Sequence, residues 1–360
     1  MKFSEMVLKA EKEIAGIEIN TDFEINKLRY DSRLVEPGDV FFAIRGFKTD
    51  GNKYINEAVT RGAGAVFSDL IDSFKGVSVY KVPDCRKAMA ALSNVYCNYP
   101  SQKMKIIGVT GTNGKTTISS IINFVLEYWD KKTGLVGTNG NYINKRFIKT
   151  DFTTPESVDL NQLLNEMYNS GVEYVTMEVS SHSLALSRVY GIDFDAAVFT
   201  NLTPEHLDFH ENMENYFEAK KILFDSFERI NKKGNNTAAV YNSDDEYGKR
   251  IVSGTEAERV SYGFQKAAYS VDKLKMNFEG MKFDMLVPLN GEGIEKIKIE
   301  TSLTGKFNVY NILASSAALK ALIETVNTGS AKLGEDVTSL VLMPIAVSNR
   351  VAVWKYVRAT

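Results

Sequence analysis

Between Lys105 and about residue 265, short apolar runs alternate with amphipathic helical patterns, and this alternation constrains the fold more than any other feature. Runs such as IIGVT, VEYVTMEV, FDAAVFTN and TAAVYN have the length and composition of buried strands. Buried strands that alternate with helices form a mostly parallel, doubly wound sheet. The predicted fold class is therefore α/β, and ligands are expected beyond the carboxyl ends of the strands.

The chain on either side of this region follows different patterns. Before it, the β-branched runs AVFSDL and GVSVYKV and a helical pattern over Cys85–Tyr96 predict a small N-terminal α/β domain, with a boundary in CNYPSQK. After residue 265 the pattern becomes antiparallel, and a long helix is expected from about Lys306. The predicted domains are 1–102 and 103–345.

Net charge, apolar stretches and cysteine usage indicate which partners and which cellular location to expect. The formal net charge of -2 gives no electrostatic reason to expect nucleic acid or a membrane surface. No apolar stretch approaches the ~20 residues that span a bilayer. Cys85 and Cys97 fall on one predicted helix, where buried, reduced thiols are expected. We therefore expect a soluble, cytoplasmic protein.

The loop after the first strand of the alternating region is glycine-rich and reads GVTGTNGKTT. In a strand–loop–helix context, backbone N–H groups of such a loop cradle phosphates, a lysine reaches the β- and γ-phosphates, and a hydroxyl helps to hold Mg²⁺. The strict G-x-x-x-x-G-K-[ST] pattern fails, because its first glycine would fall on Val109. The predicted nucleotide-binding residues here are Gly111, Thr112, Asn113, Gly114, Lys115, Thr116 and Thr117.

Further candidate site residues follow two later strands. Glu178 ends VEYVTMEV, where a carboxylate beside a phosphate loop is placed to ligate Mg²⁺. All three histidines of the chain, His182, His206 and His210, fall in the loops after this strand and the next. Such clustering favours a polar site over three separate structural roles.

Lys220 lies at the middle of the apolar stripe of the helix ENYFEAKKILFDSF. An ammonium there must extend to water, find an anion, or be chemically modified. The residues alone leave these three options open.

Taken together, the segments DSRLVEPGDVFFAIRG, VTGTNGKTT, TTPES, MEVSSHSLALSRV, FTNLTPEHLDFH, YFEAKKILF and TGKFNVYNILA resemble the Mur ligase family in content and order. The resemblance implies a UDP-binding domain over 1–102 and an ATP-binding domain over 103–345. It also implies that 346–360 is a truncated linker and that the family's third, carboxyl-terminal domain is absent.

The resemblance assigns roles to individual residues. Catalytic roles would fall to Lys115, Lys220 and His206, and metal binding to Thr116, Glu178, His206 and Lys220, the last as a carbamate. Asn308 and Asn311 would lie near the adenine of ATP. The implied substrate-binding residues are Ser32, Gly46, Phe47, Lys48, Thr49, Thr153, Thr154, Ser180 and Arg188.

The resemblance also implies a reaction. With ATP and Mg²⁺, the D-glutamate carboxylate of UDP-N-acetylmuramoyl-L-Ala-D-Glu would become an acyl phosphate, and the amine of a diamino acid would displace the phosphate. L-lysine and meso-diaminopimelate both remain open as the amine. The predicted activity is thus an ATP-dependent amide ligase of peptidoglycan precursor synthesis.

One departure from the family keeps alternatives open. The expected Gly-Arg…Glu linker reads SNRVAVWK, with Asn349 and Ala352 in the glycine and glutamate positions. The chain is thus interpreted either as a ligase completed by a separate third domain, or as a binding module for nucleotide and UDP-sugar peptide that does not complete the reaction. A folylpolyglutamate-type ligase shares the central loop, but the DSR…PGDVFFA block favours a muramoyl substrate. A generic kinase or GTPase would not explain Lys220.

Overall fold

The computed structural model describes residues 1–10, 14, 16–46, 49–230, 236–289 and 293–327. Phe47, Lys48 and the predicted linker over 346–360 lie outside this part of the chain. The chain divides into two compact units. Unit 1 consists of Met1–Pro100, Pro155–Glu166 and Leu186–Ile192, and unit 2 consists of the remaining segments.

Unit 1 is built on a four-stranded parallel sheet in the order β1-β2-β3-β4. Its strands are β1 (Leu28–Arg29), β2 (Val40–Phe42), β3 (Ala65–Ser68) and β4 (Ser78–Lys81), and its helices are α1 (Phe3–Lys9), α2 (Ile55–Thr60) and α3 (Cys85–Tyr96). Stacked rings fill one side of the sheet, with Phe42 and Phe67 at 5.3 Å and Phe67 and Tyr80 at 5.4 Å between centroids. Most of α5 (Ser157–Asn169), up to Glu166, also belongs to this unit, and Val158 joins its core.

The sequence predicted the main elements of unit 1. AVFSDL and GVSVYKV form β3 and β4, and the predicted helix over Cys85–Tyr96 is α3. Asp84 caps α3 by accepting hydrogen bonds from the backbone N–H groups of Arg86 and Lys87, both at 3.0 Å. Both cysteines are buried and free, which confirms that prediction.

Unit 2 contains an eight-stranded sheet in the order β12-β11-β10-β5-β9-β6-β7-β8. The β12 to β6 part is parallel, and β7 and β8 add an antiparallel hairpin at one edge. The strands are β5 (Lys105–Thr110), β6 (Thr133–Val136), β7 (Asn141–Ile143), β8 (Arg146–Ile148), β9 (Tyr174–Glu178), β10 (Ala196–Phe199), β11 (Ala238–Asn242) and β12 (Glu258–Tyr262). β5 lies between β9 and β10, which places its carboxyl end at the topological switch point.

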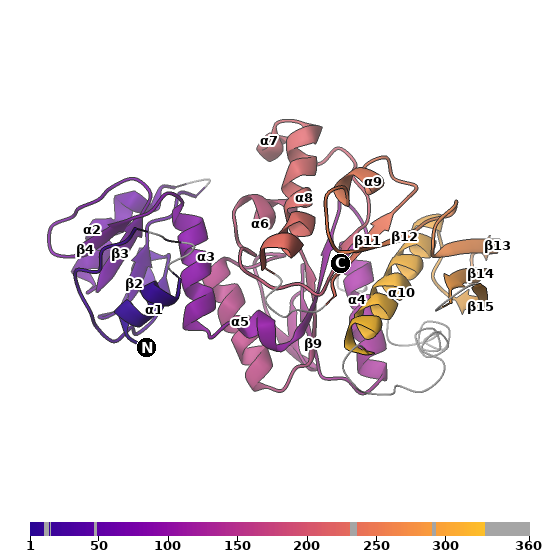
Figure 1. Ribbon diagram of the computed structural model, residues 1–360, viewed down its shortest axis with the longest axis horizontal. Coiled ribbons are helices and arrows are strands. Elements are labelled where there is room, and N and C mark those ends of the chain that lie inside the picture. The colour runs from indigo at the N-terminus through magenta and orange to yellow at the C-terminus, as the bar shows by residue number, and fades with distance from the viewer. Residues whose placement is uncertain (11–13, 15, 47–48, 231–235, 290–292, 328–360) are drawn as a thin grey trace. The chain divides into compact units, whose positions relative to one another are not determined.

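Helices cover this sheet in the manner of a doubly wound fold. They are α4 (Lys115–Tyr128), α6 (Ser181–Ala185), α7 (Leu207–His210), α8 (Met213–Ile230), α9 (Gly248–Ile251) and α10 (Lys306–Asn327). α4 and α10 lie side by side (Figure 1) and form one core with the strands, which includes Ile107, Ile121 and Leu313. α6 and α8 pack together away from that core. The predicted α/β class is confirmed.

A three-stranded antiparallel sheet precedes α10, which agrees with the antiparallel pattern predicted after residue 265. Its strands are β13 (Ser270–Asn277), β14 (Gly280–Pro288) and β15 (Ile294–Thr301). The buried side chains of β14, among them Met285, join the core formed by α4 and α10. The predicted start of the long helix at Lys306 is confirmed. The sequence did not predict β12 or the β7–β8 hairpin.

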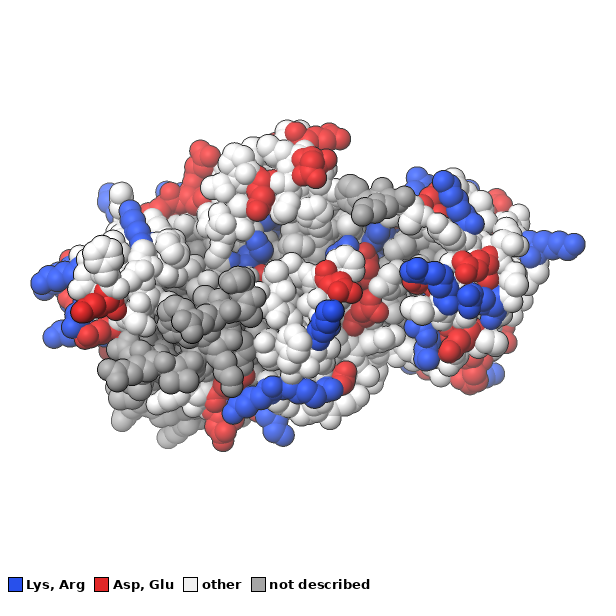
Figure 2. Space-filling view, turned by 180° about the vertical axis from the view of Figure 1, so that it is seen from behind, with Lys and Arg blue, Asp and Glu red and all other residues white. Residues whose placement is uncertain are grey.

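Charge on the surface is mixed. On the face drawn in Figure 2, lysine and arginine side chains are interspersed with aspartate and glutamate. Within the described residues, none of the helices combines the length and apolar character that crossing a membrane requires.

Candidate functional site

The glycine-rich loop links β5 to α4 and has the backbone shape of an anion-binding loop. Gly111 has φ +141°, and a Cβ added there would lie 1.8 Å from Thr200 Oγ1. Gly114 is the N-cap of α4 with φ +90°, and its Cβ would lie 2.7 Å from Asn311 Oδ1. Both positions therefore require glycine, and α4 directs its N-terminal N–H groups into the loop.

Two lysines converge on one carbonyl of this loop. Lys115 Nζ donates to Gly111 O at 2.9 Å and to Thr112 O at 2.8 Å. Lys220 Nζ, from α8, also donates to Gly111 O at 2.9 Å. Two ammonium groups that share one neutral acceptor would repel each other, so this arrangement disfavours positive charge on both lysines at once.

Lys220 is buried where the helical pattern placed it. Its side chain is 1% exposed, and its Nζ lies 4.4 Å from the ring centroid of Tyr216. Burial, followed by the nearby Lys115 charge, moves the pKa of Lys220 well below the usual value for a lysine. Burial also lowers the pKa of Lys115. The first of the three options for Lys220, extension to water, is thereby excluded.

Glu178 ends β9 as a buried carboxylate, 2% exposed, beside the loop. Its Oε2 accepts from Thr116 Oγ1 at 3.0 Å. Thr138, which follows β6, donates to it twice: its N–H to Oε1 at 3.0 Å and its hydroxyl to Oε2 at 3.1 Å. Burial raises the pKa of Glu178, and these hydrogen bonds oppose that shift.

Three predicted substrate-binding residues of unit 2 lie around Glu178. The hydroxyls of Thr138 and Thr153 are 3.0 Å apart. Thr154 Oγ1 donates to the backbone carbonyl of Glu178 at 2.8 Å and accepts from the N–H of Ser180 at 3.3 Å. The structure thus brings Thr153, Thr154 and Ser180 to the strand end that carries Glu178.

The three histidines form one cluster of rings. The His182 centroid lies 4.8 Å from that of His206 and 5.6 Å from that of His210. His206 has φ +57° and is 3.7 Å from a carboxylate oxygen of Glu205. His210 Nε2 is 2.9 Å from Ser181 Oγ, and burial lowers its pKa to about 4. The sequence-based expectation that these residues share a polar site is met.

The predicted metal-binding residues are brought together only in part. Thr116 and Glu178 share a hydrogen bond, whereas His206 contacts His182 and Glu205, and Lys220 bonds to the loop. The described residues contain no group of three or more His, Cys, Asp or Glu side chains that could hold a metal ion. The full four-residue metal set therefore stays a prediction.

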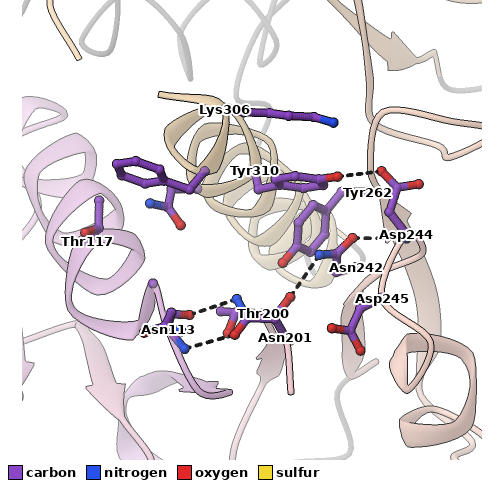
Figure 3. Close-up of a pocket in the computed structure, with 13 residues that line it drawn as sticks. Asn113, Thr117, Thr200, Asn201, Asn242, Asp244, Asp245, Tyr262, Lys306 and Tyr310 are labelled. Atoms are coloured by element: carbon purple, nitrogen blue, oxygen red, sulfur yellow. Dashed lines mark hydrogen bonds between the residues drawn. The ribbon is translucent and has the colours of Figure 1, made fainter. Parts of the chain in front are cut away.

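A pocket of about 710 Å³ opens beside the glycine-rich loop (Figure 3). It is lined by Asn113, Gly114, Thr117, Thr200, Asn201, Asn242, Asp244, Asp245, Tyr262, Lys306, Phe307, Tyr310 and Asn311. Asn113 and Asn201 hold each other at the loop end, where Asn113 N donates to Asn201 Oδ1 at 3.0 Å. At the other end Tyr310 donates to Asp244 Oδ2 at 2.9 Å. The pocket therefore runs from the loop to the start of α10.

Both predicted adenine-site residues lie on the first turns of α10. Asn311 lines the pocket and donates to Asn308 Oδ1 at 3.1 Å, and Asn308 donates to Thr304 O at 2.8 Å. Sequence reasoning missed Thr138, Asp244 and Tyr310. The sequence offered one signal for each of them. Thr138 and Asp244 lie two residues after the ends of β6 and β11, and Tyr310 lies near the start of α10.

The remaining predicted site residues belong to unit 1. Ser32 is buried and donates to Glu57 Oε2 at 2.7 Å. Gly46 N donates to Thr49 O at 2.9 Å. Arg188 is ion-paired with Glu156 at 2.9 Å. The structure thus keeps Arg188 in a different unit from Thr154 and Ser180.

Comparison with known proteins gives consistent matches. Residues 109–319 match the Mur ligase middle domain, and residues 24–102 match the Mur ligase family, catalytic domain. The UDP-N-acetylmuramoyl-L-alanyl-D-glutamate--2,6-diaminopimelate ligase of Caldanaerobacter subterraneus subsp. tengcongensis is 43% identical over 317 residues, which are 88% of this chain and 62% of that protein. The chain thus spans less than two thirds of the length of this curated relative.

Solved structures show the same likeness. A UDP-N-acetylmuramoyl-L-alanyl-D-glutamate--2,6-diaminopimelate ligase matches with a TM-score of 0.74 and 27% identity, over 93% of this chain and 68% of that one. The MurF ligase of Thermotoga maritima in complex with ADP shares the fold, with a TM-score of 0.55 and 19% identity, over 86% of this chain and 66% of that one. The chain belongs to the Mur ligase family.

Proposed function

We propose that this chain carries the UDP-binding and ATP-binding parts of a ligase that joins UDP-N-acetylmuramoyl-L-Ala-D-Glu to a diamino acid. Residues 1–102 would hold the UDP end and residues 103–345 the ATP. The similar ligases are named for 2,6-diaminopimelate, which favours this amine over L-lysine. ATP and UDP-sugars are cytoplasmic compounds, so we place the reaction in the cytoplasm.

The Lys115 ammonium group at the N-terminus of α4 carries this proposal, because the backbone N–H groups of the glycine-rich loop there also favour negative charge. Lys220 Nζ reaches the same loop carbonyl, and as a carbamate Lys220 would act through a bound cation. The adjoining pocket reaches away from the loop with aromatic, amide and carboxylate side chains, which suits a base and a ribose. A nucleoside triphosphate matches both features.

The donor set beside the loop fits Mg²⁺. Thr116 and Glu178 offer oxygen atoms, which this ion prefers. Burial raises the pKa of Glu178, and a bound cation would offset this unfavourable desolvation of the carboxylate. We propose that Thr116, Glu178 and His206, with Lys220 as a carbamate, hold the metal. Bound Mg²⁺ would neutralise charge on the transferring phosphate.

The chemistry begins with a carboxylate, which is a poor electrophile. We propose that Thr153, Thr154, Ser180 and Arg188 hold the substrate so that its D-glutamate carboxylate attacks the γ-phosphate of ATP. The products of this step are ADP and an acyl phosphate, and Lys115 stabilises the charge that develops on the phosphate. The amine then forms the amide bond and phosphate leaves.

Release of ADP and formation of amide test the proposal. The 360-residue chain is incubated with ATP, UDP-N-acetylmuramoyl-L-Ala-D-Glu and 2,6-diaminopimelate or L-lysine, with and without the carboxyl-terminal domain of a related ligase. We expect ATP to bind and ADP to form, with amide product when that domain is supplied. Lys115→Gln, which removes the charge, should abolish both.

A second candidate is a module that binds both ligands without completing the reaction. This candidate predicts binding of both ligands but no amide, even when the carboxyl-terminal domain is added. Failure of the chain to bind ATP would contradict both candidates.

A further inference from the structure

The first half of the glycine-rich loop is bonded to the segment that follows β10. Thr112 N donates to the backbone carbonyl of Asn201 at 2.9 Å. The side-chain amide of Asn201 binds both backbone polar groups of Asn113: Asn113 N donates to its Oδ1 at 3.0 Å, and its Nδ2 donates to Asn113 O at 3.3 Å (Figure 3). Thr203 N donates to the Thr112 hydroxyl at 3.0 Å. The segment after β10 therefore holds successive residues of the loop.

Lysine side chains occupy the other carbonyls of this half of the loop. Lys115 Nζ donates to the carbonyls of Gly111 and Thr112, and Lys220 Nζ donates to that of Gly111. A backbone N–H is a single donor, and those of Thr112 and Asn113 already have acceptors on Asn201. These N–H groups are therefore not available to a phosphate oxygen.

The second half of the loop leads into α4 and has a different hydrogen-bonding state. Gly114 is the N-cap of α4, and Ile118 N donates to Gly114 O at 2.9 Å. The N–H groups of Gly114–Thr117 are thus those that an α-helix leaves without an intrahelical partner at its N-terminus. These residues are partly exposed, whereas Thr112 is 7% exposed. Phosphate oxygens can reach this second set of N–H groups.

We propose that Asn201 is a positioning residue that fixes Thr112 and Asn113, so that the backbone N–H groups that receive the phosphates of ATP are those of Gly114–Thr117. Because the first half of the loop is fixed beforehand, less entropy is lost when the phosphates bind. The inference rests on the proposed function, which supplies ATP as the ligand. It narrows the sequence-based prediction, in which N–H groups of the whole glycine-rich turn cradle the phosphates.

Amide hydrogen exchange in the wild-type chain, followed by NMR with and without ATP and Mg²⁺, tests this division of the loop. The amides of Thr112 and Asn113 should exchange slowly in both states, because Asn201 already accepts from them. The amides of Gly114–Thr117 should exchange at least about tenfold more slowly once ATP is bound.

Calorimetry of the same sample separates the two ways in which this experiment can fail. If ATP binds, then marked slowing at Thr112 and Asn113, or no slowing at Gly114–Thr117, would overturn the inference. If the wild-type chain binds ATP no better than a buffer blank, the proposed function is overturned, and the inference falls with it.

Asn201→Ala removes the amide from both backbone groups of Asn113. We expect the affinity for ATP, measured by calorimetry, to fall about tenfold, and that for adenosine, which lacks phosphates, to fall less than about twofold. The Asn113 amide should exchange faster, while Thr112 N keeps its backbone acceptor. Asn169→Ala makes the same substitution at an exposed position at the end of α5 and should change none of these.

Thermal melting shows whether Asn201→Ala folds. A residue that only stabilises the fold would lower both affinities alike, so equal losses for ATP and adenosine would overturn the inference. Wild-type affinity for ATP in the folded variant would overturn it as well. If the variant does not fold, the exchange pattern of the wild-type chain decides.

Discussion

Beside the glycine-rich loop, buried charged side chains are held by partners from distant parts of the chain. Glu178 shares its two oxygens with Thr116 and Thr138, and Gly137 is packed so closely that a Cβ there would lie 2.3 Å from Glu178 Oε1. A carboxylate held this tightly presents its oxygens in one direction. Its orientation is therefore as much a property of the β6 loop as of β9.

Thr138→Val removes the hydroxyl that bonds to Glu178 while keeping the size of the side chain and the backbone N–H. We expect Mg²⁺-dependent ATP binding to weaken by about 1 kcal/mol, or roughly fivefold, because the carboxylate loses one fixed partner. Calorimetric titration of ATP at several Mg²⁺ concentrations measures this. Thr138→Ser keeps the hydroxyl and should bind as the wild type does, so equal losses in both variants would contradict the prediction.

Lys220 should react with CO₂. Its lowered pKa favours the neutral amine, which adds to CO₂ to form a carbamate and releases one proton. The product is an anion, which would turn the repulsion from Lys115 into attraction. Intact-mass measurement under native conditions with bicarbonate and Mg²⁺ should show one added CO₂, absent in Lys220→Met. An unmodified mass under these conditions would show that Lys220 acts as an amine.

His210 should make stability depend on pH on the acidic side. Its pKa falls from 6.5 to about 4 on folding, so between these values the unfolded chain binds a proton that the folded chain does not. The contribution of His210 to the free energy of unfolding is thus fully present above pH 6.5 and is lost as the pH falls towards 4. Urea unfolding at about pH 7 and about pH 5 should show a larger loss in the wild type than in His210→Gln. Equal losses would count against the buried, neutral ring.

At the scale of single residues, sequence reasoning succeeded where a side chain and its environment lie on one element. Lys220 and its apolar stripe share α8, so its position on the apolar face of the helix could be predicted from spacing alone. Thr138 and Asp244 became site residues only through partners on other strands and helices. Contacts between residues far apart in the chain leave no local sequence pattern, so only the folded structure shows these partners.

Among the elements, α3 connects several parts of unit 1. It packs on β2 and β3, Arg86 on it donates to Glu156, and Asn94 on it donates to Tyr190 O. Its N-terminus is capped by Asp84, whose carboxylate accepts from two backbone N–H groups. The cap fixes the first turn, where Arg86 lies. Loss of the cap would therefore also disturb the hydrogen bonds from Arg86 to Arg45 O and Glu156 Oε2.

Asp84→Ala should lower the free energy of unfolding by about 1 kcal/mol, because the two N–H groups lose their acceptor. Asp84→Asn retains a capping oxygen and should cost less. Chemical denaturation of both variants measures the difference. Identical stabilities of the alanine and wild-type chains would mean that the cap is satisfied by water at no cost.

In the parallel part of the large sheet, the strands that were predicted from the sequence are the most buried ones. β5, β9, β10 and β11 are almost fully buried and give continuous apolar runs. β12 is largely exposed, and β7 and β8 have three residues each, too short for a periodic pattern. Exposed or very short strands are specified by their neighbours in the sheet, and a single sequence does not show those neighbours.

At the scale of the whole molecule, unit 1 is discontinuous. The boundary predicted within CNYPSQK lies where its first segment ends, but two later segments return to it. They are tied in by buried groups, Glu156 to Arg86 and the Tyr190 carbonyl to Asn94. This return could not be predicted from the sequence, because the hydrophobic pattern of α5 is the same whichever unit the helix packs against.

A fragment of residues 1–102 should therefore be less stable than the same residues in the whole chain. It would lack Val158 from its core and Glu156 beside Arg86. Hydrogen exchange of the α3 amides should be faster in the fragment than in the 360-residue chain. A fragment that ends at residue 192 contains all three segments of unit 1 and should recover protection. Equal protection in the short fragment would show that the later segments add nothing.

The discontinuity also has a consequence for synthesis on the ribosome. The chain emerges from its N-terminus, so the first hundred residues leave the exit tunnel well before residues 155–192. In that interval α3 is exposed on the side that Glu156 and Val158 later cover, and β5 and β6 of the other unit have already emerged. Unit 1 cannot complete its fold before the growing chain has released Ile192. A translational pause placed after that residue would favour correct folding, whereas one near residue 100 would prolong an aggregation-prone intermediate.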